Sequence, residues 1–522
     1  VNWDDDWEII HGDTYVQDGT ILTITGNYGF GEFANIFVVQ GGSLIIDGGH
    51  LTKACDALWP GIDVWGHYNQ SQQPKLNQGF IKVSNGGTIE FAEVAIETIQ
   101  YQGGEHCFST SGGIVKAQDA QFKDNIIDVY LYPYNNFDPV TEELLPNTSR
   151  FKNAQFLTSG LICNPESHMV LHDVHGIVIS GCKFKNLSNA SACPIQYNEG
   201  KGIYSFNSDF YVKDYCINTT ITPCPETNRT EFHNLDYGIY ALASRPIDYI
   251  EIDTCILENN RTGIYLSGLS EPVIISNSFH VRKVDTTSNP NDIYGGIYLD
   301  YCTGYQVEEN QFYTYWGTDE LEDRMSIGIA INNSGVEYNQ IYNNYFSQLY
   351  IGILAQNKNR SSDGEDGLVL RCNDNLKNVY DFAVTTCWSN ANDFGIRDDQ
   401  GSNGNYAEAP ASNIFSYSYN PNIGNDYCDY YNECALITYY HQYGPQTKRI
   451  IPLYFDEDFV LPNQSSYISG YDKSENCPSN LNPGTFIEMM NQQSSAEQSI
   501  DSVQSLLDLS LIHISEPTRP TT

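Results

Sequence analysis

The sequence has few basic residues. It carries 26 Lys and Arg against 65 Asp and Glu, which leaves a formal net charge of −39. Such a surface repels nucleic acid phosphates and anionic lipid headgroups, so neither is an expected partner. It attracts divalent cations and permits a structural calcium, although an acidic surface more often only keeps a protein in solution. No other cofactor is expected.

Long hydrophobic runs are also missing. No apolar stretch reaches the roughly 18 residues that span a bilayer, so membrane insertion is not expected. Methionine is scarce at 4 residues, whereas the chain holds 42 Gly and 38 Tyr among many Ile, Val, Thr and Asn. This composition favours many short strands separated by turns over helices.

One short sequence recurs along the chain. It is Gly-Ile-Tyr at Gly202, Gly238, Gly263 and Gly296, and weaker forms begin at Gly328, Gly352, Gly367 and Gly395. Successive glycines lie 15 to 36 residues apart. Repeats that carry loops of different length produce this irregular period.

A second sequence follows the first at a nearly constant distance. Phe279 lies 16 residues after Gly263, and equivalent phenylalanines follow the next two glycines by 16 and 18 residues. The fixed offset indicates two strands of one structural repeat. Glycine turns that lead into alternating strands also recur near the start of the chain, at Gly19, Gly42, Gly87 and Gly113.

These patterns predict an all-β fold, a right-handed parallel β-helix with irregular loop insertions. Alternating apolar residues point inward, glycine permits the turns, and asparagines at the turns can form hydrogen-bonded ladders between coils. A propeller needs longer repeats with hairpins, and a series of sandwiches would not keep a fixed offset between glycine and phenylalanine.

The predicted organisation has four parts. Residues 1–420 form the parallel β-helix, and residues 421–484, rich in Tyr and Cys, form a C-terminal cap that protects the exposed end strands. Residues 485–508 are a linker or a marginal helix. Residues 509–522 resemble a translated sequencing adapter, so we expect them to be an artefact that replaces the natural C-terminus.

The 14 cysteines indicate an oxidising compartment. Cys216 with Cys224, and Cys428 with Cys434, are close enough in sequence to close loops. Four others lie in or beside apolar strands and are expected to be buried thiols: Cys182, Cys255, Cys302 and Cys372.

The repeats resemble those of right-handed β-helix repeat proteins, and more closely those of large secreted β-helix proteins that bacteria export by type IX secretion. The matching stretches are Val39–Gly49, Asp56–Gly66, Leu235–Tyr240 and Gly296–Phe312. The likeness covers roughly residues 15 to 480. It implies a secreted or cell-surface bacterial protein. The group's C-terminal sorting domain is not found, as a truncated tail would produce.

Catalytic motifs of β-helix polysaccharide hydrolases are not in their usual order. Asp398-Asp399 lies far downstream of His175-Gly176, whereas the inverting enzymes place an Asp pair before a Gly-His-Gly. A lyase site needs local positive charge beside calcium carboxylates. The basic residues are scattered instead, with Arg245, Arg261, Arg282 and Arg324 in predicted turns.

Three groups of residues are candidate metal ligands. Asp363-Gly364-Glu365-Asp366-Gly367 lacks the full spacing of an EF-type loop, and Asp4-Asp5-Asp6 is a short acidic turn. His168, His172 and His175 lie in a predicted strand and would not all share one face. We therefore assign no catalytic or cofactor-binding residue and leave a metal site undetermined.

The sequence favours a monomeric, non-enzymatic extracellular or cell-surface solenoid for adhesion, glycan contact or surface architecture. Its expected partner is a polysaccharide or a cell-surface glycan, since exposed Tyr and Trp stack on sugar rings. One alternative is a pectate-lyase-like polysaccharide lyase or glycoside hydrolase whose site is assembled from loops. Another is a spacer that displays a missing C-terminal domain.

Overall fold

The computed structural model describes residues 1–102, 105–162, 164–188, 198–218, 224–245, 247, 249–282, 294–314, 326–386, 393–404, 410–416, 428–442, 449–466 and 472–481. The chain divides into two compact units, Val1–Asn476 and Cys477–Thr522. Every sheet formed by the described residues belongs to the first unit.

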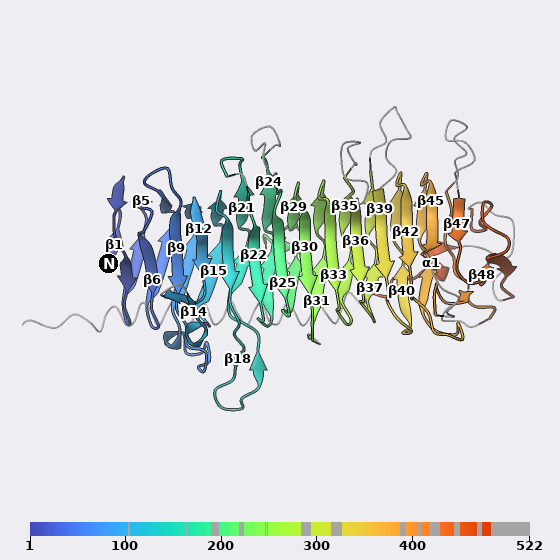
Figure 1. The fold of residues 1–522 in the computed structure, drawn as a ribbon, viewed down its shortest axis with the longest axis horizontal. Helices are drawn as coiled ribbons and strands as arrows, with labels where there is room; N and C mark the ends of the chain where they lie inside the picture. Colours follow the sequence, from blue (N-terminus) through green and yellow to red (C-terminus); the bar gives the residue numbers. More distant parts are fainter. Residues whose placement is uncertain are drawn as a thin grey trace, which may run out of the picture. The chain divides into compact units, whose positions relative to one another are not determined.

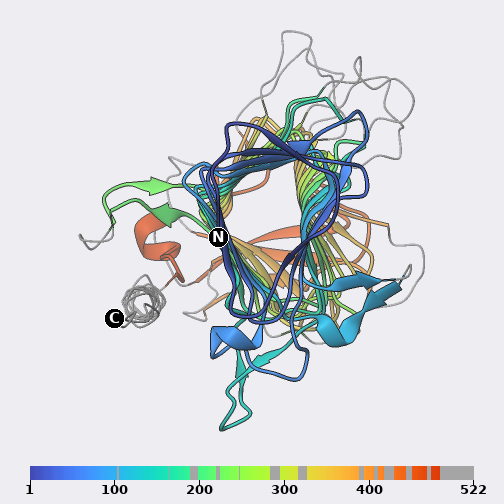
Figure 2. The same cartoon turned by 90° about the vertical axis from the view of Figure 1, so that its left-hand side faces the viewer.

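Three parallel sheets form the walls of this unit (Figure 1). Each coil of the chain adds one strand to each sheet, so neighbouring strands in one sheet come from successive coils. Figure 2 looks along the stack of coils and shows the three walls around a shared interior. The predicted all-β parallel β-helix is therefore confirmed.

Sheet A consists of β1 (Asn2–Trp3), β4 (Ile21–Ile24), β7 (Ser43–Asp47), β10 (Phe80–Ser84), β15 (Ile114–Gln118), β20 (Arg150–Lys152), β23 (Ile177–Ser180), β26 (Phe210–Lys213), β31 (Ile250–Asp253), β34 (Val273–Ile275), β37 (Gln306–Glu308), β40 (Asn339–Tyr342) and β43 (Leu368–Arg371).

Sheet B consists of β2 (Glu8–Ile10), β5 (Asn27–Phe30), β8 (His50–Lys53), β11 (Thr88–Glu90), β16 (Gln121–Lys123), β21 (Gln155–Thr158), β24 (Lys183–Asn186), β29 (Glu231–His233), β32 (Ile256–Glu258), β35 (Ser278–His280), β38 (Gln311–Tyr313), β41 (Tyr345–Ser347) and β44 (Asp374–Leu376).

Sheet C consists of β3 (Thr14–Val16), β6 (Asn35–Val38), β9 (Trp59–Val64), β12 (Ala92–Glu97), β17 (Ile127–Leu131), β22 (Ser167–His172), β25 (Lys201–Phe206), β30 (Tyr237–Leu242), β33 (Thr262–Ser267), β36 (Tyr294–Asp300), β39 (Ser326–Asn332), β42 (Ile351–Gln356), β45 (Tyr380–Thr385) and β47 (Cys428–Asn432).

Smaller elements lie outside these walls. Three are hairpins: β13 (Gln100–Gln102) with β14 (Glu105–Cys107), β18 (Asn136–Phe137) with β19 (Leu144–Leu145), and β27 (Tyr215–Cys216) with β28 (Thr227–Asn228). A separate small sheet joins β46 (Asp399–Gln400), β48 (Ile437–His441) and β49 (Val460–Gln464). The described helices are short: η1 (Lys75–Asn77), η2 (Phe108–Thr110) and α1 (Lys473–Asn476).

The repeated sequences occupy equivalent places in successive coils. Each Gly-Ile-Tyr lies in a strand of sheet C, where the Ile side chain is buried and the Tyr side chain points outward. The phenylalanines of the second sequence lie in sheet B and stack inside the solenoid. Phe279, Phe312 and Phe346 have ring centroids 4.5 and 5.0 Å apart. The predicted pairing of the two sequences in one coil is thus confirmed.

An asparagine ladder runs through the turns that precede sheet B. The side chains of Asn277, Asn310, Asn344, Asn373 and Asn413 are buried, and each of the first four donates to the next at 3.0 to 3.3 Å. Each side chain also donates to a backbone carbonyl of the preceding coil, as Asn310 does to Ile274 at 2.8 Å. The predicted asparagine ladders are therefore present.

The walls extend to β47, so regular strands reach into residues 421–484, the predicted cap. The small sheet of β46, β48 and β49 also draws on that segment. The predicted linker at 485–508 and the predicted artefact at 509–522 lie outside the described residues.

Candidate functional site

One outward-facing row of side chains crosses every strand of sheet C. Strand pairing places these residues at equivalent positions, one per coil. We call this row the sheet C wall. It comprises Tyr15, Phe37, Asp63, Glu97, Tyr130, Val170, Tyr204, Tyr240, Tyr265, Tyr298, Ala330, Leu354, Ala383 and Tyr431.

The centre of the wall is a run of tyrosines. Tyr204, Tyr240, Tyr265 and Tyr298 are all partly exposed. Tyr240 and Tyr265 stack with ring centroids 4.8 Å apart, and Tyr265 meets Tyr298 edge-on at 5.3 Å. The rings point outward because strand alternation turns the intervening residues, such as Ile239 and Ala241, into the core. The result is a continuous aromatic surface parallel to the long axis.

A polar row runs beside the wall from β33 to β42, two residues further along each strand than Tyr265, Tyr298, Ala330 and Leu354. Its members face the same side of sheet C and are Ser267, Asp300, Asn332 and Gln356. Asp300 accepts hydrogen bonds from the Asn332 amide at 2.8 Å and from the Tyr265 hydroxyl at 3.4 Å. Hydroxyl, carboxylate and amide groups therefore border the aromatic surface.

A second aromatic group lies at the N-terminal end of the wall. The Tyr15 and Phe37 rings are 4.8 Å apart, and Trp65 packs against Phe37 at 5.4 Å. Tyr15 is half exposed. Asn35, on the same strand as Phe37, donates to the Asp63 carboxylate at 2.9 Å. Aromatic faces and hydrogen-bonding groups thus adjoin here too.

Asp63 and Glu97 form a buried carboxyl pair in this part of the wall. They are paired in register on the adjacent strands β9 and β12, and their side chains lie within hydrogen-bonding reach of each other. The β13–β14 hairpin is tied to the pair. The Tyr101 backbone N–H donates to Asp63 at 3.4 Å, and the His106 ring lies 3.7 Å from Glu97 and 2.8 Å from the Tyr132 hydroxyl.

Burial makes one shared proton the stable state of this pair. Loss of hydration, followed by the charge of Asp63, raises the pKa of Glu97 to about 8. Loss of hydration likewise raises the pKa of Asp63 to about 6, against the hydrogen bond from Asn35. Burial also lowers the pKa of the neighbouring His106, which disfavours a compensating positive charge beside the pair. The arrangement resembles a proton-sharing carboxyl dyad.

Ionisation of the pair should loosen the hairpin. A carboxyl pKa that is raised by folding means that the folded chain holds a proton that the unfolded chain releases. The associated stability is therefore complete below the ordinary Glu pKa of 4.5 and is lost as pH rises through about 8. We expect Glu97→Gln to remove this pH dependence, which should amount to about 1.4 kcal/mol for each pH unit between 4.5 and about 8.

Hydrogen exchange of residues 100–107 between about pH 5 and about pH 9 measures the effect. Glu105→Gln, at an exposed position of the same hairpin, is the matched control and should behave as the parent protein does. Equal pH dependence in the parent protein and Glu97→Gln would rule out the pair as its source.

The candidate histidines do not converge. The strand prediction was correct for His168 and His172, which lie in β22. His168 is buried and binds Asp128 at 2.6 Å, His172 lies 3.3 Å from Asp173, and His175 pairs with Asp209. Each ring thus has its own carboxylate partner. Among the residues that the structure describes, no group of three or more His, Cys, Asp or Glu can hold a metal ion.

The other candidates also fall in separate places. Asp398 pairs with Arg360. Their part of the solenoid is far from His175, because strands β26 to β43 of sheet A lie between the two sites. In the turn at Asp363, the Asp363 carboxylate accepts hydrogen bonds from the Ser361 hydroxyl at 2.5 Å and from the Glu365 backbone N–H at 3.3 Å. The carboxylate is therefore engaged within its own turn.

The acidic turn at Asp4-Asp5-Asp6 serves the N-terminal coils. The Tyr28 hydroxyl donates to Asp5 at 3.4 Å, and the Asn27 amide donates to the Asp6 carbonyl at 2.9 Å. These contacts join the first two coils.

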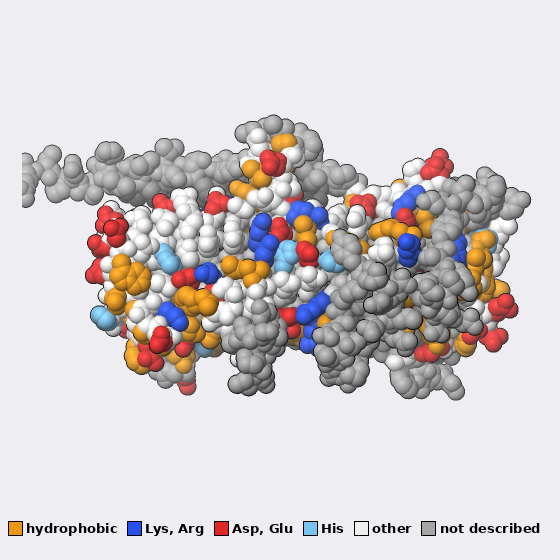
Figure 3. Space-filling model, turned by 90° about the horizontal axis from the view of Figure 1, so that it is seen from above, with side chains coloured by type: hydrophobic (Ala, Val, Ile, Leu, Met, Phe, Trp, Pro, Cys, Tyr) orange, Lys and Arg blue, Asp and Glu red, His pale blue; other side chains and the backbone are white. Residues whose placement is uncertain are grey.

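The four arginines do not form a basic groove within the described part of the chain. Arg245 pairs with Asp173 at 2.6 Å, and Arg282 pairs with Glu199. Arg261 contributes positive charge to the same Glu199 neighbourhood. Arg324 lies outside the described residues. Basic, histidine and acidic side chains are instead interspersed, as Figure 3 shows for one face.

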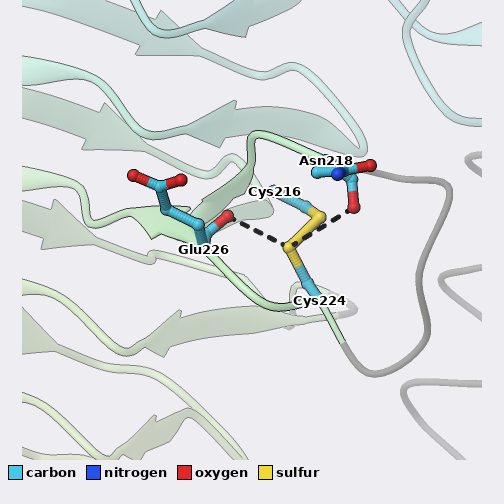
Figure 4. Close-up of a disulfide and its surroundings, with 4 residues drawn as sticks. All are labelled: Cys216, Asn218, Cys224 and Glu226. Carbon is cyan, nitrogen blue, oxygen red and sulfur yellow. Dashed lines mark hydrogen bonds between the residues drawn. A yellow bond between two sulfur atoms is a disulfide. The ribbon is translucent and has the colours of Figure 1, made fainter.

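The cysteine predictions are partly correct. Cys216 and Cys224 form a disulfide with an S–S distance of 2.01 Å (Figure 4). Cys182, Cys255 and Cys302 are buried free thiols, as predicted. Two predictions are wrong. Cys372, although buried, is disulfide-bonded, and Cys428 is a free thiol, so it does not pair with Cys434.

The Asp63–Glu97 pair was not predicted from the sequence. The available signal was a carboxylate at an outward position within an apolar strand, Ile62-Asp63-Val64. Its partner lies 34 residues away on the next coil, so only the strand register brings the two together.

No helix in the described ranges is both long and apolar enough to cross a membrane.

Comparison with known proteins supports the fold. The family model described as "right handed beta helix region" matches residues 175–350. This segment holds the coils from β23 to β41 and the tyrosine run of the sheet C wall. A search of curated proteins gives no match to the chain. The chain is therefore an all-β parallel β-helix solenoid with a right-handed β-helix region at its centre.

Proposed function

We propose that the protein is a non-enzymatic extracellular or cell-surface solenoid that binds glycan chains along the sheet C wall. The observation that carries this proposal is the outward tyrosine row from Tyr204 to Tyr298, bordered by Ser267, Asp300 and Asn332. Aromatic faces stack on the apolar faces of sugars, while polar neighbours hydrogen-bond to hydroxyl groups. A glycan chain would lie parallel to the long axis.

The repeat of the wall supports an extended ligand. Successive strands of a sheet lie about 4.8 Å apart, which is close to the length of one pyranose unit. In the coils of Tyr265 and Tyr298 each ring has a polar neighbour, Ser267 or Asp300. In the coils of Tyr204 and Tyr240 the same position holds Phe206 or Leu242. The net charge of −39 disfavours polyanionic chains, so neutral glycans are the expected class.

Removing rings from the wall should weaken binding. We expect Tyr240→Ala and Tyr265→Ala each to lower the affinity for a neutral oligosaccharide about 3- to 10-fold, since an aromatic contact contributes about 0.5–1.5 kcal/mol. Tyr345→Ala, on the outer face of sheet B, removes a comparably exposed tyrosine and should leave affinity unchanged. A glycan array identifies the ligand, and calorimetry measures each variant.

A different outcome would refute this function. Binding that survives both wall substitutions, or that is lost equally in Tyr345→Ala, places the ligand elsewhere. No binding to any glycan, together with no adhesion of coated beads to cells, would leave a spacer role.

The Asp63–Glu97 pair favours a second candidate, a polysaccharide-cleaving enzyme. A carboxyl that remains protonated near neutral pH is suited to general acid catalysis. However, the two carboxyls lie within hydrogen-bonding reach of each other, whereas glycosidases separate theirs by about 5–9.5 Å. Turnover of a pectic, alginate and glycosaminoglycan panel with calcium tests this candidate. Activity that Glu97→Gln abolishes would support it, and no activity would exclude it for that panel.

A further inference from the structure

The chain contains ten Asn-X-Ser/Thr sequences, the acceptor motif for N-linked glycans. They begin at Asn69, Asn147, Asn186, Asn189, Asn218, Asn228, Asn260, Asn332, Asn359 and Asn463. Those at Asn189 and Asn218 include residues outside the described ranges. The other eight are fully described and show where a transferred glycan would lie.

Four of the eight asparagines are interior hydrogen-bonding residues. They are Asn147, Asn186, Asn260 and Asn359, with 3%, 1%, 4% and 0% exposure. The Asn260 amide donates to the Phe232 carbonyl at 2.9 Å and accepts from the Leu235 N–H at 3.0 Å. The Asn359 amide donates to the Gln356 carbonyl at 2.7 Å and accepts from the Ser334 N–H at 2.9 Å.

A glycan on any of these four nitrogens is incompatible with the fold. Transfer from a lipid diphosphate oligosaccharide forms a bond between the sugar anomeric carbon and the Asn Nδ2. The sugar–phosphate bond breaks, the lipid diphosphate leaves, and the amide loses one proton. At Asn260, for example, the sugar would occupy the space next to the side-chain nitrogen, where that nitrogen now donates to the Phe232 carbonyl. The solenoid cannot enclose the sugar, because its interior is closely packed.

In the remaining four acceptor sequences, the Ser or Thr residue of the motif is buried. The partners of Asn69, Asn228, Asn332 and Asn463 are Ser71, Thr230, Ser334 and Ser465, which are 0 to 2% exposed. A transferase must reach both residues of the motif. After folding, therefore, none of the eight described sequences is a complete accessible acceptor.

The disulfide limits the cellular compartments in which the protein can mature. Cys216–Cys224 requires an oxidising environment, which the eukaryotic secretory pathway and the bacterial envelope both provide. The secretory pathway adds glycans before folding is complete, when the four interior asparagines are still exposed. We infer that this chain matures in an oxidising compartment that lacks N-linked glycosylation, as a bacterial envelope or exterior does. The inference does not depend on what the sheet C wall binds.

Secretion of the full chain from yeast, with and without an inhibitor of lipid-linked oligosaccharide synthesis, tests the inference. We expect glycans on the four interior asparagines in aggregated chains only, and an approximately tenfold higher yield of folded protein under the inhibitor. Soluble, protease-resistant protein with a glycan at Asn147, Asn186, Asn260 or Asn359 would overturn the inference.

A second measurement applies even if yeast fails to secrete the chain. Protein folded in the bacterial periplasm is incubated with a purified oligosaccharyltransferase and its lipid-linked donor, and site occupancy is determined by mass spectrometry. We expect transfer to the denatured chain but not to the eight motifs of the folded chain. The denatured Thr262→Val chain, which lacks the Asn260 motif, verifies the assignment of that site. Transfer to Asn260 or Asn359 of the folded protein would contradict the inference.

Discussion

Replacing Asn310 with alanine should lower the stability of the solenoid by about 3 kcal/mol or more. Asn310 is fully buried in the middle of the asparagine ladder. Its carbonyl oxygen accepts the Asn277 backbone N–H and side-chain amide, both at 3.0 Å. Its own amide donates to the Ile274 carbonyl at 2.8 Å. Alanine leaves the buried Asn277 N–H without an acceptor, which costs about 1–3 kcal/mol. It also removes the side-chain donor to the Ile274 carbonyl, which keeps its backbone partner in the β34–β37 ladder.

The matched control for Asn310 is its neighbour. Gln311→Ala removes an exposed amide at the next position, the first residue of β38, and should change stability by less than about 0.5 kcal/mol. Chemical unfolding, followed by circular dichroism and by hydrogen exchange in β35 and β38, measures both variants. Similar losses of stability in the two variants would show that the hydrogen bonds of the asparagine ladder contribute no more to stability than an exposed amide does.

Gly296→Ala should be comparably damaging, with a loss of about 3 kcal/mol. A methyl group on Gly296 would lie 2.5 Å from the Phe312 ring and 2.7 Å from the Gly328 carbonyl oxygen. Both contacts are far below van der Waals distance. The phenylalanine stack of sheet B thus occupies the space that a side chain in this part of sheet C would need.

The adjacent Gly295 offers an internal control. A methyl group there meets nothing closer than the Ile327 carbonyl at 3.5 Å, so Gly295→Ala should be tolerated. Adding Phe312→Leu to Gly296→Ala should restore part of the loss, because the equivalent Gly238 faces Leu257 at a looser 3.2 Å. The unfolding midpoints of the single and double variants provide the comparison. Full tolerance of Gly296→Ala would mean that the coil adapts without cost.

The fold was predictable because its sequence signals are local. Glycine, the alternating Ile and Tyr, and the phenylalanine at a fixed offset all lie within one coil, and each coil repeats them. The candidate site depends on register between coils. Alternation alone predicts that each tyrosine of the sheet C wall faces outward. The alignment of these residues into one row, and the contact between Asp63 and Glu97 across a 34-residue gap, require knowing which strands pair.

The cysteines show the same limit. Cys216 and Cys224 are close in sequence, and their disulfide was predicted correctly. Cys372 was assigned as a free thiol because it borders an apolar strand, but burial does not distinguish a thiol from a disulfide. Proximity in sequence also misled for Cys428 and Cys434, since it does not fix which way each side chain points.

The turn column that ends in the asparagine ladder changes character along the axis. Its N-terminal positions are Gly26, Gly49, Gly87, Ala120 and Ala154, which have no side-chain hydrogen-bonding group. Cys182, Thr230 and Cys255 follow, and the C-terminal positions are the five asparagines. The coils of the asparagine ladder are therefore fastened to one another at this position of the turn by side-chain amides as well as by backbone, whereas the coils from Gly26 to Ala154 are joined at the same position by backbone alone. When the two ends are pulled apart, the coils should detach in sequence from the N-terminal side, and the ladder should be the last part to give way.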